Sequence, residues 1–128
     1  MEVNEWVIIA SRNQAKIFNR RNRQKPLKWM STLKNPDRPS KNEFINNSEP
    51  EIALTSGQVT KRFARKIADR LKVGADQHAF KKLYIFAEPH LLGCIKNEIP
   101  KCMKNIIIEW IAKDLEKATA QEITERVS

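Results

Sequence analysis

The chain has 128 residues, enough for one domain that buries about two-thirds of its unfolded surface without a disulfide or a metal. Its 41% hydrophobic and 30% charged residues exclude a low-complexity chain and predict a folded globular unit. Residues 11–41 hold ten Lys or Arg and one acid, which accounts for the whole net charge of +9. This concentration favours a polyanionic partner, nucleic acid first and an anionic membrane surface second.

Three strands are predicted in the first third of the chain. Residues 6–10 (WVIIA) form a β-branched, continuously apolar run, which is typical of a central strand covered on both faces. After a polar break, residues 15–20 and 27–33 read as two further strands, and the polar residues 21–24 supply a turn between them. The sequence therefore predicts a β-meander at the start of the domain.

A long polar loop and a basic helix follow. Residues 35–56 are rich in Asn, Pro, Ser and Glu, which predicts a loop. In residues 57–71 the apolar side chains fall at helical spacing and cations occupy the other face. Thr55 or Ser56 can cap the start of this helix, and Gly74 is the expected stop at its end.

Strands and helices alternate in the second half. Residues 82–87 read as a buried strand, and Pro89 is placed to open a helix. Residues 106–111 read as a last strand, and Thr119 and Glu122 have capping-box spacing ahead of a final helix. The order β-β-β-α-β-α-β-α predicts a single α/β domain over residues 1–128, with a mixed five-stranded sheet flanked by helices.

The termini and the cysteines indicate where the protein works. The acidic start is unlike a signal peptide, and no apolar run exceeds five residues, so no transmembrane segment is predicted. Cys94 and Cys102 lack the spacing of a metal site, which is typical of idle thiols in a reducing compartment. The sequence therefore predicts a cytoplasmic protein.

Three segments resemble the bacterial family named for a protein required for attachment to host cells. They read WVIIASRNQAKIF, LYIFAEPHLLGCIKNEI and WIAKDLEKATAQEI. Members of that family share a first strand that ends in Ala, an A-x-P-x-x-L-G-x-L-R segment and a K-D-L near the end. Here the A-x-P-x-x-L-G-x-L-R pattern falls on residues 87–96, with Ile95 and Lys96 in place of Leu and Arg. The K-D-L falls on residues 113–115.

That family is similar in turn to the middle domain of archaeal and eukaryotic class-one peptide release factors, a mixed sheet flanked by helices. In that domain a Gly-Gly-Gln loop precedes a basic helix with a pattern like GGQSAxRFxRxR. Residues 56–66 (SGQVTKRFARK) resemble this pattern, with Ser56 in place of the first Gly. The resemblance makes Gln58 a weak candidate for hydrolysis of a peptidyl or aminoacyl ester of RNA, whereas the residues alone read as the first turn of a helix.

The leading hypothesis is a non-enzymatic, cofactor-free domain that binds RNA or the ribosome through phosphate contacts. The contacts come from the basic helix and from the basic hairpin, whose cations are Arg12, Lys16, Arg20, Arg21 and Arg23. The alternative is a protein-interaction or adhesion-related module in which the same cations bind an acidic protein or an anionic surface. The expected contact residues are Arg12, Lys16, Arg20, Arg21, Arg23, Lys61, Arg62, Arg65 and Lys66.

Two polar residues are candidates for a ligand pocket. Glu88 and His90 follow a buried strand at the start of a helix, where open α/β sheets often bind ligands. Pro89 between them fits a plain helix entry equally well. No zinc spacing or phosphate-binding loop is found, and no acid lies between Glu5 and Asp37, so no metal site is predicted.

Three aromatic residues are candidates for a stacking surface beside the basic hairpin. Phe18, Trp29 and Tyr84 could stack on nucleic-acid bases. Aromatic residues at strand spacing more often fill a core, so burial is the expectation for all three.

Overall fold

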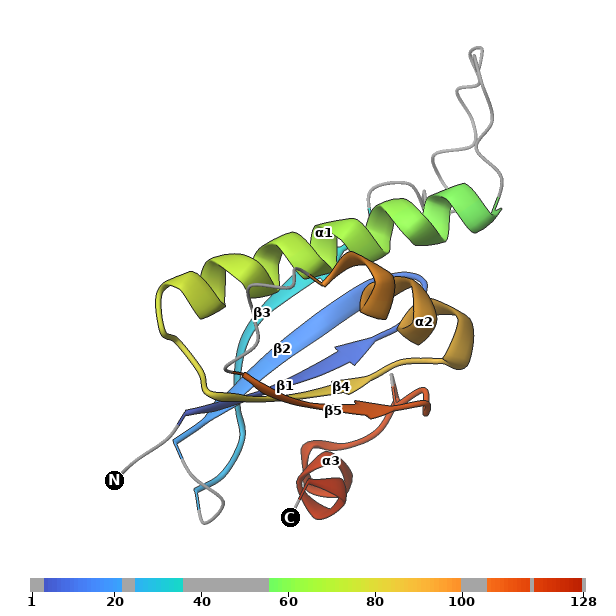
Figure 1. The fold of residues 1–128 in the computed structure, drawn as a ribbon. Helices are drawn as coiled ribbons and strands as arrows, with labels where there is room; N and C mark the ends of the chain where they lie inside the picture. Colours follow the sequence, from blue (N-terminus) through green and yellow to red (C-terminus); the bar gives the residue numbers. More distant parts are fainter. Residues whose placement is uncertain (1–3, 22–24, 36–55, 100–105, 116, 128) are drawn as a thin grey trace.

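The computed structural model of the chain (Figure 1) describes residues 4–21, 25–35, 56–99, 106–115 and 117–127. The polar loop predicted at residues 35–56 therefore lies, apart from its two ends, outside the described residues. The same is true of Arg23 and Cys102.

The first strand forms the middle of the sheet. β1 (Glu5–Ala10) is buried along its whole length, as its apolar run predicts. It pairs antiparallel with β2 (Gln14–Arg20) and parallel with β4 (Lys82–Phe86). The edges are β3 (Lys28–Lys34), antiparallel to β2, and β5 (Ile107–Ile111), parallel to β4. The order β3-β2-β1-β4-β5 confirms the predicted mixed five-stranded sheet and its opening meander.

Helices cover both faces of this sheet. α1 (Ser56–Asp76) and α2 (Pro89–Glu98) lie on one face and α3 (Ala120–Arg126) on the other (Figure 1). Because side chains alternate along a strand, Trp6 and Ile8 join the core under α1 and α2, whereas Val7 joins the core under α3. The chain therefore folds as three layers, with the sheet in the middle.

The two shorter helices begin where the sequence predicts. Thr119 and Glu122 make the capping box of α3, with the Thr119 side chain accepting from the Glu122 N–H. Pro89 occupies the first turn of α2, and Glu88 is its N-cap residue. Both helix starts are therefore fixed by local hydrogen bonds.

The predicted stop of α1 at Gly74 is wrong. The helix runs on to Asp76, and His78 takes the left-handed conformation (φ 57°) that a helix stop requires. The Ala79 N–H donates to the Gly74 carbonyl at 2.8 Å, and the His78 N–H donates to the Ala75 carbonyl at 3.0 Å. This pair of bonds is a Schellman motif, so the polar segment after Gly74 closes the helix.

Gly74 has a packing role instead. It is buried against the rings of Trp6 and Phe80, whose centroids are 4.5 Å apart. A Cβ added at Gly74 would lie 2.8 Å from an atom of each ring, closer than real Cβ contacts. Glycine therefore lets the last turns of α1 approach the start of β1.

We expect Gly74→Ala to lower the free energy of unfolding by about 1–3 kcal/mol, because the added methyl group overpacks a closed contact. Gly93 in α2 is the matched control, since nothing lies within 4 Å of a Cβ added there. Gly93→Ala should raise the stability by up to about 1 kcal/mol, the usual helix gain. Urea unfolding measures both, and a Gly74→Ala variant as stable as Gly93→Ala would contradict the packing role.

Candidate nucleic-acid interface

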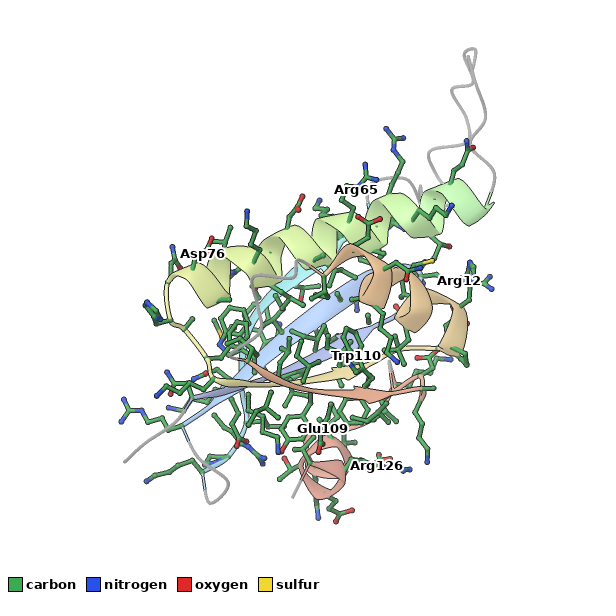
Figure 2. The ribbon with its side chains drawn as sticks, in the orientation of Figure 1. Arg12, Arg65, Asp76, Glu109, Trp110 and Arg126 are labelled. Carbon is green, nitrogen blue, oxygen red and sulfur yellow. The ribbon has the colours of Figure 1, made fainter. Side chains whose placement is uncertain are left out.

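Four cations, named here the helix cations, lie on the exposed side of the second and third turns of α1. Phe63, Ala64 and Ile67 occupy the opposite side of these turns and are buried against the sheet. Since the apolar stripe fixes the rotation of the helix, the basic side chains face solvent. Figure 2 shows Arg65 on the side of α1 that faces away from the sheet. The helix cations are Lys61, Arg62, Arg65 and Lys66.

Like charges lie close together on the exposed side of α1. The pairs Lys61–Arg65 and Arg62–Lys66 place like charges four residues apart, which costs about 0.2–0.5 kcal/mol each. The first turn has no acid and the last turn has no base, although both would favour the helix dipole. Arg65 Nε lies 3.3 Å from Glu98 Oε1, but its side chain is 67% exposed, so this pair contributes little.

Arg12 lies on the turn between β1 and β2, at the same end of the molecule as the start of α1 (Figure 2). Ser11 Oγ accepts from the N–H groups of Asn13 and Gln14, both at 3.3 Å. The Asn35 Nδ2 donates to the Arg12 carbonyl at 2.9 Å. The turn is thus fixed while the Arg12 side chain stays exposed, and it extends the basic end of α1.

Arg20 does not lie on the surface, and its assignment as an exposed phosphate contact is wrong. Its side chain is buried, with Nε donating to Glu5 Oε1 at 2.7 Å and Nη2 donating to the Val127 carbonyl at 2.6 Å. Glu5 is its antiparallel partner on β1, and the Cζ atom of Arg20 lies 5.8 Å from the centre of the Tyr84 ring. Arg20 therefore ties β1, β2 and the end of α3 together.

The hairpin cations do not share one side with the helix cations. Lys16 pairs with Ile9, on the face of the sheet that α3 covers, whereas α1 lies on the other face. Arg21 is exposed, but it follows the far end of β2, about 20 Å from the Arg12 turn by strand length. Of the hairpin cations, Arg12 is therefore the one that the described structure brings to the end where α1 begins.

The segment that resembles the release-factor loop is helical. α1 already begins at Ser56, so Gly57 and Gln58 lie exposed in its first turn. This confirms the interpretation of the residues as a helix start. Gln58 is therefore part of the helix, two residues after its first residue.

Glu88 is engaged in the local structure at the start of α2. Its Oε1 accepts from the Leu91 N–H at 2.8 Å, which satisfies one of the free N–H groups of the helix. His90 is exposed on the following turn. The plain helix entry therefore explains Glu88, and a ligand role for the pair stays a prediction.

The expectation of burial is wrong for Trp29. Phe18 and Tyr84 are buried as expected, but Trp29 is 61% exposed on the edge strand β3. Its Nε1–H donates to Thr32 Oγ1 at 3.0 Å, and Thr32 is the cross-strand partner of Lys16. An aromatic surface next to a cation is suited to stacking on a base.

The described ranges contain neither a candidate membrane span nor a candidate metal site. No helix placed there has the length and apolarity to cross a bilayer. The same ranges contain no group of three or more His, Cys, Asp or Glu that could hold a metal ion.

A mixed sheet between two layers of helices, with a basic helix that begins Ser-Gly-Gln, is the arrangement of a release-factor-like α/β domain. Residues 4–127 match the family described as bacterial archaeo-eukaryotic release factor family 12, and the chain belongs to that family. This confirms the release-factor part of the sequence resemblance. Its host-attachment part stays a prediction.

Individual proteins give a more distant likeness. The chain is 38% identical over 69 residues to an uncharacterized protein of Rickettsia prowazekii (strain Madrid E), covering 52% of this chain and 45% of that protein. A structure described as an archaeal protein is similar with a TM-score of 0.50 and 14% identity, covering 96% of this chain and 36% of that one. An archaeal translation termination factor has a TM-score of 0.45 and 12% identity, covering 96% and 37%. The chain spans less than half the length of each of them.

Arg20 and Arg21 allow a matched comparison of a buried and an exposed cation. We expect Arg20→Gln to lower the free energy of unfolding by about 3–5 kcal/mol, because it leaves the Glu5 carboxylate buried without its partner. Arg21→Gln should change it by less than about 0.5 kcal/mol. Urea unfolding of both variants gives the measurement.

The double variant Glu5→Leu/Arg20→Met serves as the rescue. Replacing both charges with apolar groups should restore most of the lost stability, since no carboxylate is then left unpaired. Equal stabilities of Arg20→Gln and Arg21→Gln would show that the ion pair contributes nothing.

Proposed function

We propose that this domain binds structured RNA, on the ribosome or free, through phosphate contacts made by the helix cations and Arg12. The observation that carries the proposal is the placement of four exposed cations on adjacent turns of α1, with like charges four residues apart in the pairs Lys61–Arg65 and Arg62–Lys66. A polyanion would relieve their mutual repulsion, and phosphate contacts of Lys and Arg supply most of the affinity of non-specific nucleic-acid binding.

The family gives independent support for a partner in translation. Its description refers to release factors, which act on the ribosome. Contacts between cations and phosphates predict binding that depends on charge and RNA shape and little on sequence. We place this activity in the cytoplasm, where translation occurs.

The alternative partner is an acidic protein or an anionic surface, as in an adhesion-related role in host attachment. It uses the same cations but predicts indifference to RNA. Capture of partners by the purified protein, with and without ribonuclease, separates the two proposals. A partner that is retained at full yield after ribonuclease treatment would contradict the RNA proposal.

Ester hydrolysis through Gln58 is a weaker proposal that rests on the release-factor resemblance. Gln58 is exposed in the first turn of α1, beside the helix cations in sequence. We therefore propose that any catalysis is secondary to binding. Unchanged hydrolysis of a peptidyl-RNA substrate by Gln58→Ala would dismiss it.

The charge proposal predicts a loss of salt dependence without a loss of stability. We expect Lys61→Gln/Lys66→Gln to reduce the slope of log affinity against log salt by about 1.4–1.8, since each phosphate contact contributes about 0.7–0.9. The free energy of unfolding should stay constant or rise by up to about 1 kcal/mol, because two like-charge pairs are removed. Fluorescence anisotropy with a labelled structured RNA measures the slope.

Lys72→Gln/Lys113→Gln is the matched control. It removes the same number of exposed charges, from the C-terminal half of α1 and from the segment after β5. Its slope should change by less than half as much as that of the helix variant. Equal changes in the two variants would show that net charge, and not the surface of α1, governs binding.

A further inference from the structure

A second basic region lies at the end of the β2–β3 hairpin where the two strands are connected, which is the end of the sheet opposite the Arg12 turn. It contains a hollow of about 520 Å³, which is within the range of small-ligand sites. No described lining residue is acidic. The residues that line this hairpin hollow are Asn19, Arg20, Arg21, Lys25, Pro26 and Lys28.

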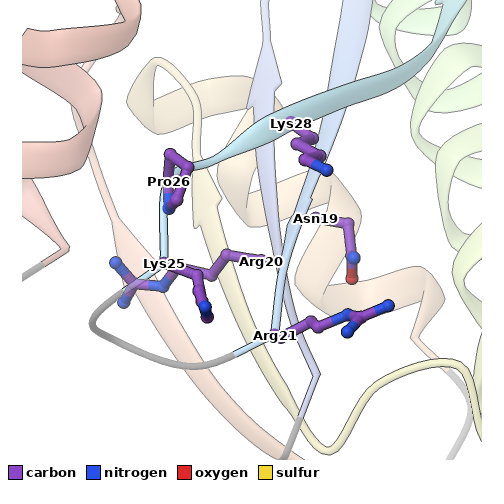
Figure 3. A pocket seen from close by; sticks show the side chains of 6 residues that line it. All are labelled: Asn19, Arg20, Arg21, Lys25, Pro26 and Lys28. Atoms are coloured by element: carbon purple, nitrogen blue, oxygen red, sulfur yellow. The ribbon is translucent and has the colours of Figure 1, made fainter.

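The cations approach the hollow from two sides. In Figure 3 the side chains of Asn19, Arg21 and Lys28 extend to one side of the β2 ribbon, whereas Arg20 runs the other way, toward Lys25. Arg21, Lys25 and Lys28 are exposed, so their charged groups can move to meet a ligand. An anion with several oxygens suits this arrangement, because different cations can bind different oxygens.

The buried Arg20 adds a fixed part to the hollow. Glu5 and the Val127 carbonyl hold two of its nitrogens, but Nη1 is buried with no hydrogen-bond partner among the described residues. Both Nη1 and Asn19 Oδ1 are closed to solvent in this structure, so these two side chains form the wall of the hollow. Contact with a ligand falls to the three exposed cations.

The charge balance favours a phosphate group over a neutral ligand. The Glu5 carboxylate offsets the charge of Arg20, which leaves three exposed cations around the hollow. We propose that the hairpin hollow binds a phosphate group, carried either by a small phosphorylated molecule or by an RNA strand. The site is separate from the helix cations and does not depend on the RNA-binding role proposed for them.

The experiment titrates the ¹⁵N-labelled full chain with inorganic pyrophosphate and follows the amide signals by NMR. We expect saturable shifts at residues 19–21 and 25–28. Arg21→Gln and Lys28→Gln should each weaken binding about fivefold, the effect of one partly exposed ion pair. Lys34→Gln is the control, because it removes the same charge from the other end of β3 and should leave the affinity unchanged.

A second arm distinguishes the sources of the phosphate. A short single-stranded oligoribonucleotide that displaces pyrophosphate from the hollow assigns the site to an RNA strand, and one that does not assigns it to a small phosphorylated molecule. The proposal is overturned if pyrophosphate gives no saturable shifts, or if Arg21→Gln and Lys28→Gln bind it as tightly as Lys34→Gln. Lys61→Gln/Lys66→Gln should still bind pyrophosphate, which separates this site from the surface of α1.

Discussion

Burial of β1 on both faces is the constraint on which the rest of the structure depends. All six residues of this strand are buried, so the fold must supply an apolar cover above and below it. α1 and α2 provide one cover and α3 provides the other. The apolar stripe of α1 packs against the sheet, so the basic face of the helix is directed to solvent. The candidate interface is thus a consequence of how the core closes.

Position in the fold, and not residue type, separates the roles of the cations. Arg20 lies opposite Glu5 on a strand of the central pair, where burial turns a cation into part of the framework. Lys61 and Lys66 lie on a helix face that nothing in the described structure covers, where repulsion between neighbours leaves them suited to a polyanion. The net charge of the chain therefore overstates the charge that is available for binding.

The sequence predicted the strands, the helix order, the Pro89 start of α2 and the capping box of α3, because these depend on local periodicity and short-range hydrogen bonds. It could not predict that Arg20 meets Glu5 and Val127, since that contact joins residues up to 107 positions apart. It placed the stop of α1 at Gly74, because a glycine needed for close packing looks the same in sequence as one needed for a turn. The exposure of Trp29 was missed because strand spacing does not reveal which strand is at the edge.

The central claim is that the outer face of α1 binds RNA phosphate. The most direct test is NMR mapping of the ¹⁵N-labelled chain with a structured RNA at low ionic strength. The account predicts that the largest amide perturbations fall on residues 58–66 and around Arg12, and that they vanish as salt rises. Perturbations confined to other surfaces, or none at low salt, would contradict it.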